Sequence, residues 1–106
     1  MSIREITPAE LQQLLSDENP PTLIDVREDG EAAICAINGS TLIPMNSVPQ
    51  RLQEIPRDKP VVLYCHHGGR SMMVGQFLAR NGYDTMNLTG GIDRWAIEIE
   101  PGMARY

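Results

Sequence analysis

The sequence has little positive charge, no long apolar run and few cysteines. Its 106 residues carry nine Lys and Arg against fourteen Asp and Glu, a formal net charge of −5. A chain of this charge has no general attraction for nucleic acid phosphates or anionic lipid, so we expect neither nucleic acid nor membrane as a partner. No apolar run approaches the ~20 residues needed to span a bilayer. Residues 1–8 also lack the apolar region of a secretory signal.

The two cysteines, Cys35 and Cys65, are too few for a disulfide framework. Their spacing is not that of metal ligands, so we expect no metal site. Two reduced thiols in a chain without an export signal are typical of the cytoplasm, which is the predicted location.

Length and composition favour one compact domain over residues 1–106. Hydrophobic residues make up 42% of the chain and charged residues 22%, close to the averages for soluble globular proteins. Domains of about 100–150 residues are the most common size. We therefore expect a folded domain rather than a disordered chain.

Short apolar runs alternate with helical patterns. The sequence predicts strands at 22–26, 41–43, 61–65 and 85–88. It predicts helices from Pro8, over 31–34, from Ser47 through Leu52, over 70–81, and after the glycine pair 90–91, with Thr7 and Ser47 as N-caps. This alternation is typical of an α/β domain with a mostly parallel sheet and helices on both faces. In such sheets the ligand site lies beyond the carboxyl ends of the strands.

The loop after the strand 61–65 has the composition of an anion-binding cradle with a reactive thiol. Cys65 ends the strand, and Arg70 and Ser71 open the next helix. A loop that leads into a helix N-terminus points backbone N–H groups inward, and Gly68 and Gly69 give it backbone freedom. A cysteine in this position has its thiolate stabilised, which lowers its pKa. We therefore predict that Cys65 is an activated nucleophile.

Other polar residues near this loop have two interpretations each. Arg70 either binds an anionic substrate or pairs with an acidic residue that shapes the loop. His66 and His67 are expected to point outward and line the pocket mouth rather than to bind metal. Asp25 and Arg27 follow the strand 22–26. They either touch substrate or, as we prefer, have structural roles, in which Asp25 caps backbone amides and Arg27 makes an ion pair.

Four segments in order along the chain give a resemblance to single-domain rhodaneses, a sulfurtransferase family. They are residues 23–28 (LIDVRE), 39–44 (GSTLIP), 65–71 (CHHGGRS) and 88–95 (LTGGIDRW). The resemblance implies a rhodanese-like domain with Cys65 as the catalytic residue. It places the substrate-binding groups on the residues that follow, which are His66, His67, Gly68, Gly69, Arg70 and Ser71.

The resemblance also implies a reaction in two half-steps. Cys65 would take sulfane sulfur from thiosulfate or a related donor as a persulfide. It would then pass that sulfur to cyanide or to a thiol acceptor, which includes thiols on other proteins. The covalent persulfide takes the place of a cofactor, and none is expected. Cys35 is predicted to be buried and structural, with a second possibility that it resolves the Cys65 persulfide as a disulfide.

Two other functions are compatible with the same residues. A rhodanese-like module that binds a partner or senses sulfur species would lack turnover, whereas the intact Cys65, glycine pair and Arg70 favour an enzyme. Cysteine phosphatases and arsenate reductases also combine a cysteine, a backbone cradle and an arginine. The cradle of cysteine phosphatases is one residue longer than the four residues between Cys65 and Arg70 here. A persulfide sulfur fits the tighter loop, so sulfur transfer is the preferred prediction.

Overall fold

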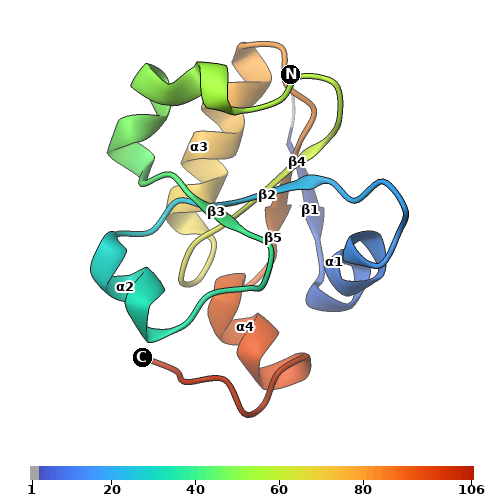
Figure 1. The fold of residues 1–106 in the computed structure, drawn as a ribbon, viewed down its shortest axis with the longest axis vertical. Coiled ribbons are helices and arrows are strands. Elements are labelled where there is room, and N and C mark those ends of the chain that lie inside the picture. Colours follow the sequence, from blue (N-terminus) through green and yellow to red (C-terminus); the bar gives the residue numbers. More distant parts are fainter. Residues whose placement is uncertain (1–2) are drawn as a thin grey trace.

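The computed structural model describes residues 3–106, which form a five-stranded sheet in the order β1-β5-β4-β2-β3 (Figure 1). The strands are β1 (Arg4–Ile6), β2 (Thr22–Asp25), β3 (Thr41–Leu42), β4 (Val61–Tyr64) and β5 (Thr85–Leu88). Every neighbouring pair is parallel. The predicted α/β class and parallel sheet are confirmed.

Helices cover both faces of the sheet, as predicted. One face packs against α1 (Pro8–Leu15) and α4 (Gly91–Glu98), and the other against η1 (Met45–Glu54) and α3 (Gly69–Arg80) (Figure 1). The side chains of β4 alternate between the two layers. Val61 and Leu63 belong to the η1 and α3 core, while Val62 and Tyr64 belong to the α1 and α4 core. A strand buried on both sides in this way gives the continuous apolar run seen in the sequence.

The predicted start of α1 is confirmed. Thr7 Oγ1 accepts a hydrogen bond from Glu10 N at 3.2 Å, and Glu10 Oε1 accepts one from Thr7 N at 2.8 Å. Pro8 occupies the first turn, where its missing N–H would have had no partner within the helix. All three signals are local, so the sequence is enough to predict them.

The predicted N-cap at Ser47 is wrong. Residues Met45–Glu54 form 3-10 turns that begin after Pro44 and kink at Arg51, and Ser47 N donates to Pro44 O at 2.8 Å inside them. Pro49 lies within this segment and has no N–H to donate to an α-helical ladder. Short 3-10 turns therefore replace the expected α-helix.

The structure also adds a strand that the sequence did not predict. β1 has only three residues, of which Arg4 and Glu5 are exposed, and it lies at the edge of the sheet. It exists because it pairs with β5, with Arg4 opposite Met86 and Ile6 opposite Leu88. No local pattern in so short a segment indicates that pairing.

Several helix and strand ends differ from prediction by one or two residues. α2 (Asp29–Ile34) starts two residues before its predicted range, and α3 spans Gly69–Arg80 instead of 70–81. β2 and β4 end at Asp25 and Tyr64, which leaves Val26 and Cys65 at the start of the connecting loops. Among residues 3–106, no helix has the length and apolar character that crossing a bilayer would require.

The carboxyl ends of β2 and β4 lie next to each other in the sheet, with Asp25 opposite Tyr64. α2 follows β2 and α3 follows β4, so both helices begin at the same edge. This edge brings together the turn after Val26 and the loop after Tyr64, as predicted from the sequence.

Candidate active site

The loop between β4 and α3 wraps around the sulfur of Cys65. Cys65 Sγ accepts hydrogen bonds from Gly68 N at 3.1 Å and from Ser71 N at 3.5 Å. Ser71 Oγ lies 3.3 Å from the same sulfur. The sulfur therefore faces oriented N–H groups at the N-terminus of α3, the arrangement that stabilises an anion.

Burial and hydrogen bonding act on the Cys65 thiol in opposite directions. The residue is 2% exposed, and this burial raises the pKa of the thiol. Hydrogen bonds from the Ser71 side chain and from the backbone of Ser71, Gly68 and Arg70 lower it by more. The pKa of Cys65 therefore lies below its ordinary value, so the thiolate is favoured.

Gly68 and Gly69 differ in whether their backbone conformation requires glycine. Gly68 has φ +116°, a left-handed conformation that a side chain would strain, and its N–H bonds the sulfur. Gly69 is the first residue of α3 and has no positive φ, and a Cβ there would meet nothing within 4 Å. The prediction that both glycines supply special backbone angles is therefore wrong for Gly69.

The second glycine of the pair before α4 lies against the Cys65 loop. Gly91 has φ +63°, and a Cβ at this position would lie 2.3 Å from His66 O. The first turn of α4 approaches the loop so closely that Ile92 N donates to Cys65 O at 2.9 Å and Asp93 N donates to His66 O at 3.2 Å. The N-terminus of α4 thus holds the carbonyl side of the Cys65 loop.

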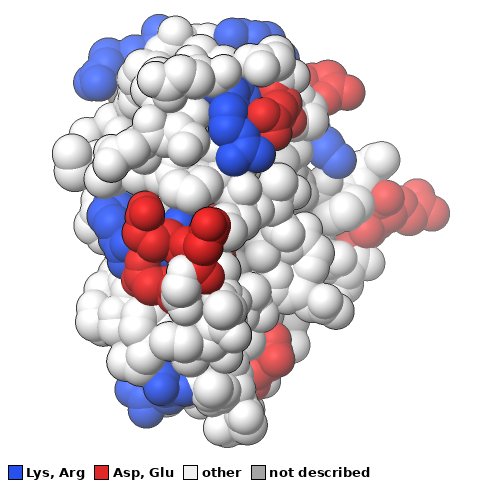
Figure 2. Space-filling model, turned by 60° about the vertical axis from the view of Figure 1, so that its left-hand side comes forward, with Lys and Arg blue, Asp and Glu red and all other residues white. Residues whose placement is uncertain are grey.

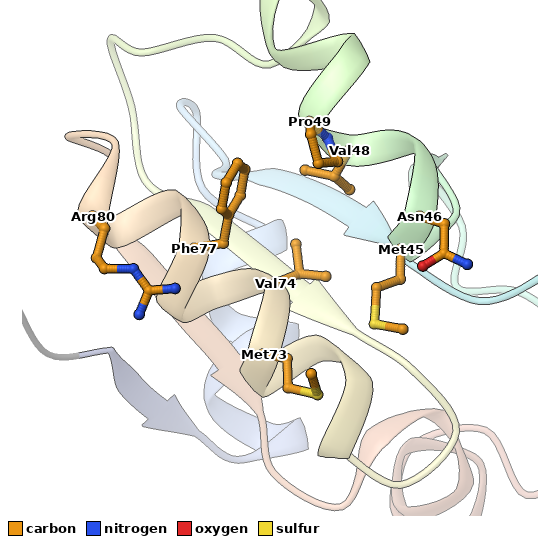
Figure 3. A pocket seen from close by; sticks show the side chains of 8 residues that line it. All are labelled: Met45, Asn46, Val48, Pro49, Met73, Val74, Phe77 and Arg80. Atoms are coloured by element: carbon orange, nitrogen blue, oxygen red, sulfur yellow. The ribbon is translucent and has the colours of Figure 1, made fainter.

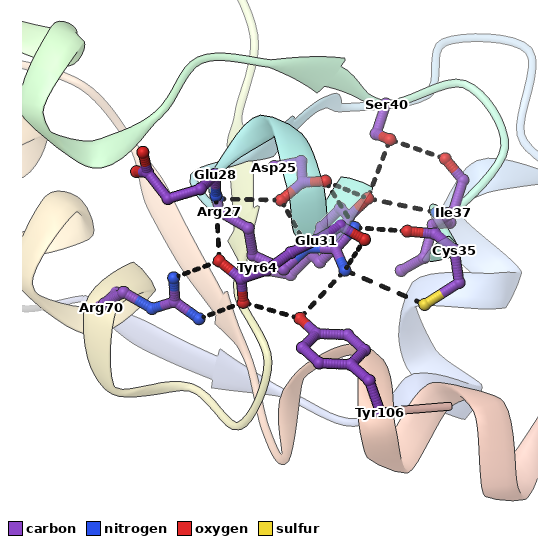
Figure 4. Close-up of polar contacts among 10 residues, drawn as sticks. All are labelled: Asp25, Arg27, Glu28, Glu31, Cys35, Ile37, Ser40, Tyr64, Arg70 and Tyr106. Atoms are coloured by element: carbon purple, nitrogen blue, oxygen red, sulfur yellow. Dashed lines mark hydrogen bonds and ion pairs between the residues drawn. The ribbon is translucent and has the colours of Figure 1, made fainter. Parts of the chain in front are cut away.

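Arg70 forms a two-pronged ion pair with Glu31 of α2. Its Nη1 and Nη2 donate to Glu31 Oε2 and Oε1 at 2.7 and 2.8 Å (Figure 4). The hydrogen bonds from Arg70 hold the pKa of Glu31 well below its usual range, and Glu31 raises the pKa of Arg70 in turn. This is the pairing with an acidic residue considered for Arg70 from the sequence, while binding of an anionic substrate by Arg70 stays a prediction.

Asp25 and Arg27 have the structural roles that the sequence favoured, and they form a buried ion pair with each other. Arg27 Nη2 donates to Asp25 Oδ2 at 2.7 Å, and Arg27 Nε and N both donate to Asp25 Oδ1. Arg27 also donates to the carbonyl of Cys35 at 2.7 Å and to the hydroxyl of Tyr106 at 3.1 Å (Figure 4). The pair therefore ties the end of β2 to the end of α2 and to the C-terminal segment.

Three aromatic rings stack beside the loop. The ring of His66 lies between those of His67 and Tyr106, with centroids 4.0 Å apart on each side. The His67 side chain is 68% exposed, as expected, and its Nε2 lies 3.7 Å from Asp93 Oδ2. His66 is half-buried instead, because the Tyr106 ring covers it, and its Nε2 has no hydrogen-bond partner within residues 3–106.

The two cysteines face different cores. Cys35 is half-buried against the α1 and α4 core, with its sulfur 3.9 Å from Arg27 Nη1. Cys65 belongs to the core on the opposite face of the sheet, and both thiols are free. Cys35 is therefore only half-buried and not buried as predicted, because it ends α2, a helix with no buried residue. Its place in the core opposite Cys65 gives no support to a resolving role.

An apolar groove of about 290 Å³ runs between η1 and α3. Figure 3 shows Met45 and Val48 on one wall and Met73 and Phe77 on the other, with Arg80 at the end remote from the Cys65 loop. Met73 is 62% exposed, whereas its neighbour Met72 is half-buried.

Sequence reasoning missed three residues of the site. Glu31, Tyr106 and Asn87 all contact the loop or its immediate partners. Asn87 alone had a readable signal, because it is an amide between the apolar Met86 and Leu88 of a short strand. Nothing in the sequence near Glu31 or Tyr106 connects either residue with Cys65.

Comparison with known proteins agrees with this arrangement. The family model described as "Rhodanese-like domain" matches residues 7–98. A sulfurtransferase of Allochromatium vinosum is 39% identical over 89% of this chain and 89% of its own. Thiosulfate sulfurtransferase GlpE of Pseudomonas aeruginosa is 30% identical over 89% of this chain and 84% of its own. A crystal structure from Staphylococcus saprophyticus, 38% identical, superimposes with a TM-score of 0.84 over 92% of this chain and 97% of that one. This chain belongs to the rhodanese-like domain family.

Proposed function

We propose that this protein is a sulfurtransferase that carries sulfane sulfur as a persulfide on Cys65. The observation that carries the proposal is the position of Cys65 Sγ, 3.1 Å from Gly68 N at the start of α3. The names of the A. vinosum and P. aeruginosa relatives support the same class of reaction. We favour thiosulfate as the donor because the P. aeruginosa relative is named a thiosulfate sulfurtransferase.

In the first half-reaction the Cys65 thiolate attacks the outer sulfur of thiosulfate. A new sulfur–sulfur bond forms at Cys65, the bond within thiosulfate breaks, and sulfite leaves with the electron pair. The outer sulfur of the resulting persulfide is anionic. The N–H groups that converge on the loop, including Gly68 N and Ser71 N, supply fixed donors for that charge.

In the second half-reaction an acceptor thiolate, or cyanide, attacks the outer sulfur. The bond between the two persulfide sulfurs breaks and Cys65 leaves as a thiolate. A leaving group with a low pKa departs faster, so the hydrogen bonds that lower the pKa of Cys65 also favour this step.

The chain carries a net charge of −5, so an anionic donor must be attracted locally. Arg70 supplies a positive charge beside the loop, and the helix N-terminus supplies partial positive charge behind the sulfur. Because Glu31 offsets the charge of Arg70 in the ion pair, Arg70 chiefly supports the loop, and the N–H groups that face the sulfur supply the local attraction.

The experiment is an intact mass measurement after brief exposure to thiosulfate, and again after cyanide is added. We expect the mass to rise by one sulfur atom and the gain to disappear with cyanide. Cys65→Ser should abolish the gain and leave the fold intact, because it removes the nucleophile. Cys35→Ser is the matched control and should load like the parent protein.

Other outcomes would overturn the proposal. A sulfur gain that persists in Cys65→Ser would remove Cys65 as the carrier. A persulfide that neither cyanide nor a thiol discharges would indicate a sulfur-sensing module instead of a transferase. Hydrolysis of an aryl phosphate without any sulfur loading would indicate phosphatase chemistry.

A further inference from the structure

The hydroxyl of Ser71 lies between two hydrogen-bond acceptors. Ser71 Oγ is 2.6 Å from Asn87 Oδ1 and 3.3 Å from Cys65 Sγ, and the residue is fully buried. A serine hydroxyl carries one proton and therefore donates to one acceptor at a time. The amide oxygen and the sulfur must compete for it whenever the sulfur is a thiolate.

The orientation of the Asn87 amide is set by its other contacts. Its Nδ2 donates to Gly68 O and to Glu5 Oε1, each at 3.3 Å. Both of these groups are acceptors, so the amide nitrogen points toward them and Oδ1 points toward Ser71. Asn87 is 2% exposed in β5, so its Oδ1 has no solvent to replace the Ser71 proton.

We propose that Asn87 is a positioning residue for sulfur transfer, which holds the Ser71 hydroxyl beside Cys65 and competes with the sulfur for its proton. The proposal rests on the proposed function and deepens it. It assigns a role to a residue on β5, a different element from the strand and helix that flank the Cys65 loop.

The competition changes direction during the reaction. When Cys65 is a thiol, its S–H donates to Ser71 Oγ while the hydroxyl bonds Asn87. When the thiolate forms, the hydroxyl rotates toward Sγ and leaves Asn87 Oδ1 without a donor in a buried site, which costs free energy. When the persulfide forms, Sγ becomes a neutral bridging sulfur and the hydroxyl returns to Asn87. No proton leaves Ser71 in any of these states.

Asn87 also acts on the loop through a second contact. Its hydrogen bond to Gly68 O steadies the residue whose N–H bonds the sulfur. Loss of Asn87 thus frees the Ser71 proton, which favours the thiolate, and loosens Gly68, which disfavours it. Only the first effect requires Ser71, and this difference allows the two to be separated.

The test is a double-mutant cycle read by the pH dependence of Cys65 alkylation with iodoacetamide. The four proteins are the parent, Asn87→Leu, Ser71→Ala and the double variant, all carrying Cys35→Ser so that one thiol reacts. Leucine matches the shape of asparagine and offers no acceptor. The other charged or titratable groups around the loop stay constant in all four proteins: Glu5, Glu31, His66, His67, Arg70 and Asp93.

We expect Ser71→Ala to move the alkylation midpoint upward, because the thiolate loses a donor. Asn87→Leu is measured in each background as the factor by which it changes the alkylation rate at pH 6. We expect this factor to be roughly three- to ten-fold larger with Ser71 present than in the Ser71→Ala background. Equal effects of Asn87→Leu with and without Ser71 would overturn the proposal, since competition for a single proton requires the two residues to be coupled.

A folding control keeps the test decisive. Circular dichroism and thermal unfolding are recorded for each variant, and Asn87→Val, which suits a buried strand, replaces Asn87→Leu if the latter does not fold. Alkylation needs no sulfur transfer. Absence of sulfur loading in the parent protein would therefore contradict the proposed function, while the cycle would still decide whether Asn87 and Ser71 compete.

Discussion

At the scale of single residues, close backbone contacts around the Cys65 loop leave no space for an added side-chain atom. Gly91 is the clearest case, because a Cβ there would lie 2.3 Å from His66 O and 2.6 Å from Cys65 O. Both neighbours are backbone atoms of the loop that holds the sulfur, so neither rotates away. The shape of this loop therefore depends on the absence of one methyl group on α4.

Gly91→Ala is expected to destabilise the fold by more than about 2 kcal/mol, because it adds a backbone clash to a left-handed φ. Gly30→Ala is the matched control. Gly30 lies inside α2 with open space around its Cα, and alanine there should stabilise by about 0.5–1 kcal/mol. Urea denaturation of both variants measures the difference. A Gly91→Ala protein as stable as the parent would show that the loop and α4 separate at little cost.

At the scale of elements, the site depends on two helices that begin at the same edge of the sheet. β2 and β4 are adjacent and parallel, so α2 and α3 start side by side, and the ion pair between Glu31 and Arg70 joins them. Both side chains are less than about a third exposed, with values of 22% and 33%. The pair also receives a hydrogen bond from Glu28 N on the α2 side.

The stability contributed by Glu31 is expected to depend on pH. Its folded-state pKa is depressed, chiefly by the hydrogen bonds from Arg70, so its contribution is fully present above the unfolded pKa of about 4.5 and is lost as the pH falls toward the folded value. The difference in unfolding free energy between the parent and Glu31→Gln should therefore be larger at pH 7 than at pH 3. Denaturation at both pH values measures this difference.

The exposed Glu18 provides a control for this prediction, and Glu18→Gln should have the same stability as the parent at both pH values. A difference that does not change with pH would contradict the ion pair as its source.

At the scale of the whole molecule, ion pairs join most of the arginines to acidic side chains. Figure 2, turned so that the α2 side comes forward, shows acidic and basic groups next to each other instead of in a broad field of one sign. Ion pairs such as Arg51 with Glu54 and Arg105 with Asp93 account for part of this pattern. A surface of this kind leaves the attraction of an anionic donor to the groups at the loop itself.

The C-terminal segment closes over the loop from a distance of 40 residues along the chain, as the His66–Tyr106 stack shows. The Tyr106 hydroxyl donates to Glu31 Oε1 at 2.8 Å and accepts from Arg27 Nη1 at 3.1 Å. One side chain thereby connects the C-terminal segment, α2 and the end of β2 (Figure 4).

Tyr106→Phe should keep the stack and lose both hydroxyl contacts, at a cost of about 1 kcal/mol. We expect faster amide hydrogen exchange in residues 66–71, because Glu31 and Arg70 are held less firmly. Tyr83→Phe is the control. It removes a hydroxyl that bonds the carbonyls of Leu52 and Ile55 and should leave exchange in 66–71 unchanged. Equal exchange in all three proteins would contradict a role for Tyr106 at the loop.

Local chemistry made much of the fold predictable. The capping pair of Thr7 and Glu10, the apolar run of β4 and the glycine-rich loop after it each depend on residues close in sequence. The alternation of strands and helices then limited the topology to a parallel sheet, and its carboxyl edge predicted where the loop after Tyr64 would lie. For that reason the α/β class and the position of the Cys65 loop at the carboxyl edge of the sheet could be predicted from the sequence alone.

The contacts that tune the site come from packing between distant segments. β1 forms only by pairing with β5, and the partners of the loop come from β5, α2 and the C-terminal segment through Asn87, Glu31 and Tyr106. No period or capping pattern encodes a hydrogen bond between residues 16 or 39 positions apart. Such bonds form because the sheet order places their elements side by side, so the sequence predicts the reactive thiol and the folded chain selects the groups that control its proton.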